Sequence, residues 1–100
     1  MTGEAGDLKD GAVTREFAIV NQRGLHARAS AKFVQVVGGY DAEVTVEKDG
    51  NKVGGTSIMG LMMLAASPGC CIRVTATGRD ATTVMDALAE LIESRFGEEI

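Results

Sequence analysis

Two segments of the chain alternate between apolar and polar residues, and no other feature limits its possible folds as much. Apolar residues occupy every second position of residues 42–47 and again of residues 70–77. Successive side chains of a β-strand point to opposite faces, so each segment predicts a strand with one buried side and one side in water. A sheet of such strands needs a cover on one face only, which predicts a two-layer α+β domain.

Helical spacing and turn residues complete the order of the elements. Apolar residues spaced three and four apart predict three helices, which cover residues 27–37, 57–66 and 80–95. Two further strands are predicted at residues 14–20 and 51–54, and Asp49-Gly50 is a hairpin turn before the second of them. The predicted fold is an open-faced sandwich in the order β-α-β-β-α-β-α, a four-stranded antiparallel sheet with three helices on one face.

Length and composition restrict the class of protein. The 100 residues suffice for one domain, which we place at residues 13–100 after a flexible tail of residues 1–12. The chain lacks a run of about 18 apolar residues, the length that a membrane span needs, and its first residues lack the apolar centre of a secretory signal. A cytoplasmic protein is therefore expected.

The charge is distributed unevenly along the chain. The net charge is −4, yet residues 17–40 carry three basic side chains and no acidic one. A nucleic-acid-binding protein normally adds stacking aromatic residues to a wide basic surface, and this chain has no Trp, one Tyr and three Phe. The basic segment therefore favours a phosphate group or an acidic protein surface as its partner, and not nucleic acid.

His26, the only histidine, directly precedes the helix predicted from Ala27. A ring nitrogen there can cap the helix, and a phosphoryl group on the ring would meet free N–H groups and the positive end of the helix dipole. Arg28 can donate hydrogen bonds to phosphate oxygens, and neutral imidazole is a good nucleophile near neutral pH. The residues alone leave two interpretations open, a phosphoryl acceptor and a surface histidine that only caps the helix.

Other kinds of site find little support in the sequence. One histidine without a cluster of further ligands argues against a metal centre, and the loop at Gly24 matches neither a phosphate-binding nor a dinucleotide-binding glycine motif, so no cofactor is expected. Cys70 and Cys71 are adjacent, which suits neither a zinc site nor a relaxed disulfide. We expect both to be small, buried or half-buried strand residues.

The predicted helix 57–66 has almost no polar face. A short helix on one side of a sheet cannot bury every side, so some of its apolar residues should be exposed for docking. Three of them are expected to lie partly in the core, namely Ile58, Leu61 and Leu64. The rim of the docking surface is expected to hold Met59 and Met62, with Met63 as a further candidate. Ser57 is a plausible cap for this helix.

Two separated motifs resemble one known family. Residues 24–28, Gly-Leu-His-Ala-Arg, look like the active-site loop of HPr, the histidine-containing carrier of the phosphoenolpyruvate-dependent phosphotransferase system. Residues 57–62, Ser-Ile-Met-Gly-Leu-Met, resemble the regulatory serine and the docking helix of that family. The likeness extends over residues 14–96 in matching order, and it favours the interpretation of His26 as a phosphoryl acceptor.

The resemblance implies a phosphoryl relay. Enzyme I, itself charged by phosphoenolpyruvate, would phosphorylate His26 on Nδ1, Arg28 would steady the phosphoryl group, and a IIA domain would accept it. Residues 39–44 look most like the nitrogen-related branch, NPr, which implies a regulatory role with a nitrogen-type IIA. Ser57 would be the target of HPr kinase/phosphorylase in a cell that has this enzyme.

By the same resemblance the chain would be a stoichiometric carrier rather than an enzyme, and a monomer. Its partners would dock on a surface that comprises Arg23, Ile58, Met59 and Met62. Ala29 departs from the family pattern, which usually has proline after the arginine. We expect a slightly less fixed start of the helix and no loss of function, because alanine is itself a good helix former.

Two alternatives compete with the relay. A regulatory binding module could act through phosphoserine alone, but it would not need His26. A generic α+β binding module of similar topology would leave the joint placing of His26, Arg28 and Ser57 unexplained.

Overall fold

The computed structural model describes residues 12–98 of the chain. Its elements have the following bounds: β1 (Val13–Ala18), α1 (Ala27–Gly38), β2 (Glu43–Lys48), β3 (Asn51–Gly54), α2 (Ile58–Met63), β4 (Cys71–Thr77), α3 (Ala81–Glu93) and the 3₁₀ turn η2 (Arg95–Gly97). The predicted tail, residues 1–12, lies outside the described residues except for Ala12.

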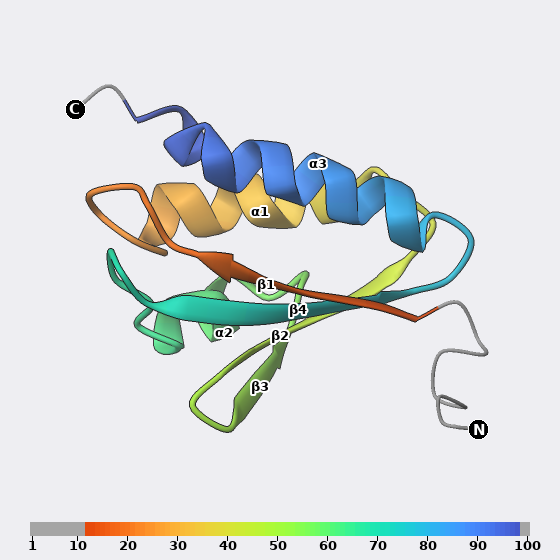
Figure 1. Cartoon of the computed structure of the whole chain (residues 1–100), viewed down its shortest axis with the longest axis horizontal. Coiled ribbons are helices and arrows are strands. Elements are labelled where there is room, and N and C mark those ends of the chain that lie inside the picture. Colours follow the sequence, from red (N-terminus) through yellow and green to blue (C-terminus); the bar gives the residue numbers. More distant parts are fainter. Residues whose placement is uncertain (1–11, 99–100) are drawn as a thin grey trace.

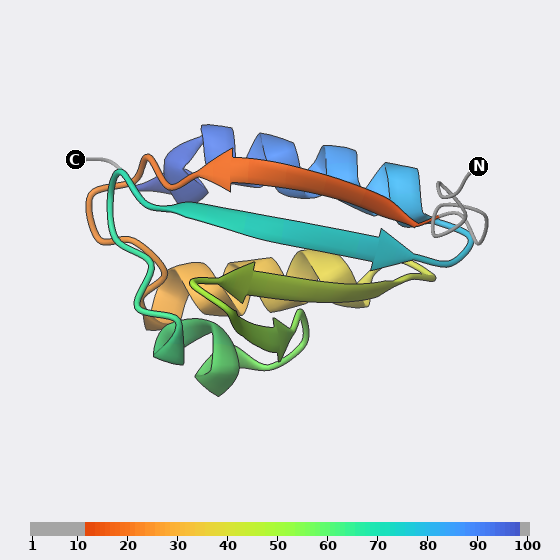
Figure 2. The ribbon, with the colours of Figure 1, turned by 60° about the horizontal axis from the view of Figure 1, so that its bottom comes forward.

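The four strands form one antiparallel sheet in the order β1-β4-β2-β3, and α1 and α3 lie side by side across one of its faces (Figure 1). The short α2 packs beside α1 next to the edge strand β3 (Figure 2). The predicted two-layer α+β sandwich is thus confirmed in its element order, its antiparallel sheet and the one-sided cover of helices.

The two alternating segments bury their apolar residues as the pattern predicts. The buried side chains of the central strands β2 and β4 are Val44, Val46, Ile72, Val74 and Ala76. The helices meet them with Phe33 from α1 and with Val84 and Leu88 from α3, each of which is 0% exposed. Burial stabilises by about 1.5–3 kcal/mol for each large apolar side chain, so this contact holds the two layers together.

The cysteines correct one prediction. β4 begins at Cys71 rather than at Cys70, because the N–H of Cys70 donates to the carbonyl of Ser67 (2.9 Å) in the preceding turn. Cys70 is half-buried, as expected, but Cys71 is exposed, and both thiols are free. The prediction of two buried or half-buried residues is therefore wrong for Cys71, since the alternation that buries Ile72 turns Cys71 toward water.

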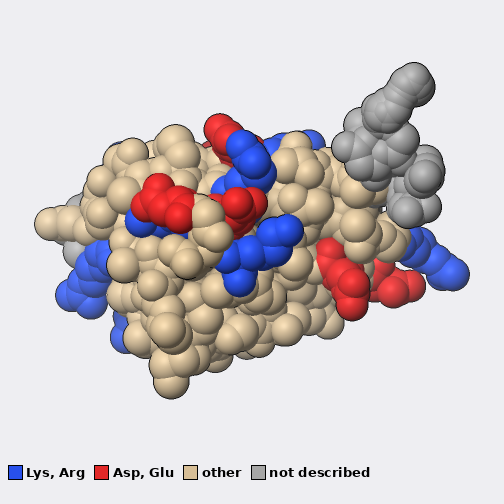
Figure 3. Space-filling view, turned by 90° about the horizontal axis from the view of Figure 1, so that it is seen from below, with Lys and Arg blue, Asp and Glu red and all other residues tan. Residues whose placement is uncertain are grey.

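The water-facing side of the sheet carries a row of opposite charges (Figure 3). Arg73 of β4 stands opposite Glu16 of β1 on one side and Glu47 of β2 on the other, and Glu47 in turn stands opposite Lys52 of β3. The Arg73 guanidinium bonds to the Glu16 carboxylate at 3.1 Å. Such cross-strand pairs contribute roughly 0.2–1 kcal/mol each, and they keep this face polar and paired.

The last helix is shorter than predicted, since the predicted helix extended to Arg95. α3 stops at Glu93, and the next residues turn the chain back, with φ of 60° at Arg95, 54° at Phe96 and 76° at Gly97. Left-handed conformations are costly for residues with a Cβ, and this turn is held by two contacts. The Phe96 side chain is buried, and the Lys32 ammonium donates to the Phe96 carbonyl at 2.7 Å.

Candidate functional site

His26 caps α1, as its position in the sequence predicts. Its backbone is extended (φ −74°, ψ −177°), and its Nδ1 accepts a hydrogen bond from the N–H of Arg28 at 3.3 Å. The loop before it is fixed at Leu25, whose N–H donates to the Ala66 carbonyl (2.9 Å) and whose own carbonyl accepts from the Ser30 hydroxyl (3.1 Å). The imidazole therefore stands at the N-terminus of the helix, where backbone N–H groups lack partners within the helix.

The other ring nitrogen of His26 faces a carboxylate. Nε2 lies 3.0 Å from Oε2 of Glu98, which the turn after α3 brings to this loop. The pKa of Glu98 is lowered, chiefly by the hydrogen bond from the Asn21 amide and further by those from His26 and from the backbone N–H groups of Arg23 and Gln22. An ionised carboxylate only accepts hydrogen bonds, so the network assigns the proton to Nε2, while Nδ1 is unprotonated and its lone pair accepts from the N–H of Arg28.

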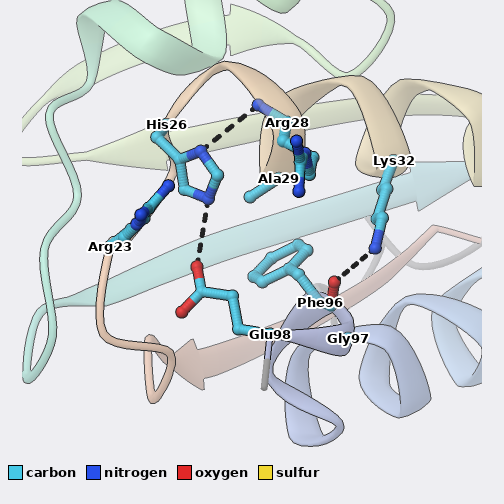
Figure 4. Close-up of a pocket in the computed structure, with 8 residues that line it drawn as sticks. All are labelled: Arg23, His26, Arg28, Ala29, Lys32, Phe96, Gly97 and Glu98. Atoms are coloured by element: carbon cyan, nitrogen blue, oxygen red, sulfur yellow. Dashed lines mark hydrogen bonds and ion pairs between the residues drawn. The ribbon is translucent and has the colours of Figure 1, made fainter. Parts of the chain in front are cut away.

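A cleft of about 390 Å³ opens in front of this ring (Figure 4). Arg23 and Arg28 lie on either side of the imidazole, Lys32 lies one turn further along α1, and Glu98 supplies one acidic group. Three basic side chains against one acidic side chain leave a charge of +2 around a neutral histidine. Guanidinium groups and a helix N-terminus together favour a doubly charged phosphoryl group in this cleft.

The short helix α2 displays the predicted apolar surface. Its cap is Ser57, whose hydroxyl accepts from the N–H of Gly60 at 2.9 Å. Four side chains are exposed: Met63 (77%), Met59 (68%), Ile58 (41%) and Met62 (39%). Leu61 and Leu64 are buried. Ile58 was expected to lie partly in the core and also to take part in docking. It is exposed, because only Leu61 and Leu64 point inward against α1 and the sheet.

The structure brings His26, Arg23 and Arg28 together in one cleft, and it places Ser57 and the methionines on the neighbouring helix α2. Sequence reasoning counted Lys32 among the basic residues of this segment without assigning it to the site, and it missed Glu98. Lys32 follows Arg28 by four residues, so helical spacing places it on the same side of α1. Glu98 had no comparable signal, since it stands 72 residues from His26 in the chain.

Within residues 12–98, no three His, Cys, Asp or Glu side chains are grouped closely enough to hold a metal ion. In the same part of the chain, none of the helices has both the length and the apolar character of a membrane span.

Comparison with known proteins agrees with this site. The family model described as the phosphorylation site of the PTS HPr component matches residues 13–94. Phosphocarrier protein HPr of Xylella fastidiosa (strain Temecula1 / ATCC 700964) is 48% identical over 84 residues, which cover 84% of this chain and 94% of the relative. Phosphocarrier protein NPr of Shewanella violacea is 36% identical over 84 residues, which cover 84% of this chain and 92% of the relative.

Among solved structures, the crystal structure of HPr-C-His from Thermoanaerobacter tengcongensis has a TM-score of 0.83 and 43% sequence identity, covering 88% of this chain and 99% of that one. Both the sequence and the fold therefore agree with one assignment. The chain belongs to the HPr family, the phosphocarrier proteins of the phosphotransferase system.

Proposed function

We propose that this HPr-family chain accepts a phosphoryl group from Enzyme I on Nδ1 of His26 and passes it to a IIA domain. The observation that carries the proposal is the unprotonated Nδ1, which accepts from the N–H of Arg28 at the N-terminus of α1, inside a cleft with three basic side chains. The chain acts as a stoichiometric carrier in the cytoplasm. It works as a monomer, because a shuttle must present the same surface first to its donor and then to its acceptor.

The transfer requires little chemistry from the protein beyond positioning and charge stabilisation. The phosphoryl group moves in line from a donor histidine to Nδ1, and the bond to the donor breaks as the new nitrogen–phosphorus bond forms. Its oxygens then accept hydrogen bonds from the first N–H groups of α1 and from Arg28. Passing the group to the IIA histidine reverses these steps.

Labelling tests this proposal directly. The chain is incubated with Enzyme I and radioactive phosphoenolpyruvate, and the product should be a phosphate that is labile in acid and stable in base, as a phosphohistidine is. The alternative, a regulatory module that acts only through phosphoserine, predicts no such label. A label that resists acid would contradict a relay through His26.

Two observations point to different acceptors among the IIA domains. The segment of residues 39–44 resembles the nitrogen-related branch, whereas the identity to the Xylella HPr (48%) exceeds that to the Shewanella NPr (36%). We propose a nitrogen-type IIA with a regulatory role. Offering the phosphorylated chain a nitrogen-type and a sugar-type IIA in one reaction tests this choice, and faster transfer to the sugar type would reject it.

The exposed surface of α2, together with Arg23, is the proposed docking site for Enzyme I. Met59→Glu should slow phosphoryl transfer from Enzyme I, because the new charge must lose its water when the partner covers it. The fold should change little, since the Met59 side chain is 68% exposed. The measurement is the initial rate of labelling together with a thermal melt.

Thr82→Glu is the matched control for Met59→Glu. Thr82 is exposed near the start of α3. The start of α3 lies at the opposite end of the molecule from the start of α1, which His26 caps (Figure 1), so the same charge there should leave the labelling rate unchanged. Unfolding of the Met59 variant would show that this side chain supports the core. An unchanged rate would remove Met59 from the docking surface.

Ser57 is the proposed target of HPr kinase/phosphorylase. A negative charge there should slow phosphoryl transfer without lowering the stability of the fold. Phosphorylation adds about −1.5 to −2 charges at the start of α2. The N-terminus of a helix attracts an anion, so Ser57→Asp should hold or raise the melting temperature. The same charge lies beside Met59 and Met62, and it should lower the rate of transfer from Enzyme I.

Ser57→Asn supplies the control for this variant. Asparagine caps a helix as well as serine does, and it adds no charge. The asparagine variant should transfer at the wild-type rate while the aspartate variant is slower, with the difference shrinking at high salt. Equal rates for both variants would leave Ser57 as an ordinary helix cap.

A further inference from the structure

We propose that Glu98 is a positioning residue for phosphoryl transfer. Its carboxylate holds His26 in the tautomer that carries the proton on Nε2, and it balances the positive charge that the ring gains when Nδ1 takes up the phosphoryl group. This inference rests on the proposed role of His26 as the acceptor.

The carboxylate is itself fixed on three sides. Oε2 of Glu98 accepts from the Asn21 amide at 2.7 Å and faces Nε2 of His26 at 3.0 Å, while Oε1 accepts from the N–H of Gln22 at 3.0 Å. Asn21 is 0% exposed, and its amide nitrogen also donates to the Gly24 carbonyl at 2.9 Å. Because both neighbours of that nitrogen are acceptors, the amide has a single orientation, and it fixes the carboxylate beside the ring.

The turn after α3 holds Glu98 in place before any partner arrives. Arg95, Phe96 and Gly97 all have positive φ, and the buried Phe96 ring and its Lys32-capped carbonyl anchor this turn between α1 and α3. The Glu98 side chain is only 11% exposed, and the His26 side chain 25%. A carboxylate that is already in position needs no reorganisation during the reaction, which is the condition under which an ionic group stabilises a developing charge most.

The chemistry of the transfer shows what this contact does. In the free carrier His26 is neutral, with a proton on Nε2 and a lone pair on Nδ1. When that lone pair forms the bond to phosphorus, the donor nitrogen takes back its own electron pair, and the His26 ring becomes an imidazolium with the proton still on Nε2. The negative Glu98 carboxylate stabilises this positive ring through the hydrogen bond that it already accepts. On transfer to the acceptor the nitrogen–phosphorus electron pair returns to Nδ1, and the ring is neutral again.

Glu98→Gln is the informative variant because it keeps the shape and removes the charge. A glutamine amide has one accepting oxygen, whereas the carboxylate accepts with both oxygens from Asn21, Gln22 and His26. Asn21 donates at the Oε2 position, so the glutamine oxygen takes that place, and as a neutral acceptor it holds the proton on Nε2 less strongly than the carboxylate does. A proton on Nδ1 would oppose the N–H of Arg28 and block the nucleophilic lone pair.

The experiment uses the full chain and compares wild type, Glu98→Gln and the control Glu93→Gln. Glu93 is exposed at the end of α3, so its variant removes the same charge without touching the ring. Nitrogen NMR of the unphosphorylated proteins reports which ring nitrogen of His26 is protonated. Enzyme I and phosphoenolpyruvate then provide the transfer rate, and a thermal melt confirms that each variant is folded.

We expect wild type and Glu93→Gln to show the proton on Nε2, and Glu98→Gln to show an increased share on Nδ1. Transfer by Glu98→Gln should fall about 10- to 100-fold, by analogy with the loss when a group that orients a metal-bound histidine is removed. An unchanged tautomer or a wild-type transfer rate would overturn the proposal, and Glu98 would then only anchor the turn after α3. If wild type itself takes no label, the relay through His26 fails, and the ring signals alone decide whether Glu98 sets the tautomer.

Discussion

Replacing His26 with alanine is expected to abolish phosphoryl acceptance from Enzyme I. Alanine removes the only imidazole of the chain, and with it the lone pair of Nδ1 that faces the N-terminus of α1. The basic side chains of the cleft remain, but they can only bind the phosphoryl group and cannot form a bond to it. The measurement is incorporation of label from phosphoenolpyruvate, which should fall to background.

The same substitution also removes a helix cap, so stability needs its own control. Loss of a cap lowers the free energy of unfolding by about 0.5–2 kcal/mol, which leaves the domain folded. His26→Asn provides the matched variant, because the asparagine oxygen can accept a backbone N–H at the start of the helix while the side chain is no nucleophile. Both variants should fail to take label, and the asparagine variant should melt closer to wild type. Acid-labile label on either variant would move the acceptor away from His26.

Replacing Gly24 with alanine is expected to lower the free energy of unfolding by about 2–4 kcal/mol, the range of a strained backbone combined with a lost buried contact. Gly24 has a φ of +66°, and a Cβ at this position would stand 2.2 Å from the carbonyl oxygen of Ala66. That oxygen is the acceptor for the N–H of Leu25, so the two loops would have to separate and His26 would move with them. A fall in melting temperature should accompany a slower transfer.

Gly69→Ala isolates the cost of the backbone conformation from that of the collision. Gly69 also has a positive φ (+90°), but a Cβ there has no atom within 4 Å. The variant should therefore lose only about 1–2 kcal/mol, the penalty of a left-handed residue, and keep its transfer rate. Chemical denaturation of both variants gives the comparison. Equal losses of unfolding free energy in the two variants would show that the two loops separate without cost and that the close approach at Gly24 does not affect stability.

Much of the fold could be predicted because its signals are local. Alternation over residues 42–47 and 70–77 decided which strand faces are buried, and a hairpin turn at Asp49-Gly50 joined two strands where the structure has them. His26 could be placed as a helix cap because the signal requires only the residues that follow it. In each case a few neighbouring residues determine the local structure, and contacts with distant parts of the chain do not change it.

Exposure on the helix α2 and the first residue of β4 could not be predicted without the packed structure. The sequence predicted that some apolar residues of α2 would face water, but only the contact with α1 decided that Ile58 lies outward and Leu61 inward. β4 begins at Cys71 and not at Cys70, because the N–H of Cys70 is bound in the turn at Ser67. Such differences of one residue or one helical face depend on packing against distant elements.

The sequence by itself determined the layers of the fold, the position of His26 at the start of a helix and the basic residues around it. Only the tertiary structure decided which ring nitrogen carries the proton, because that depends on Glu98, 72 residues away in the chain. Glu98 reaches the ring through a left-handed turn at Arg95 and Phe96, a conformation that neither residue favours by itself. The turn forms because burial of Phe96 and the hydrogen bond from Lys32 outweigh the conformational cost of the left-handed residues. A short stretch of sequence does not show these long-range contacts, so the turn could not be predicted from it.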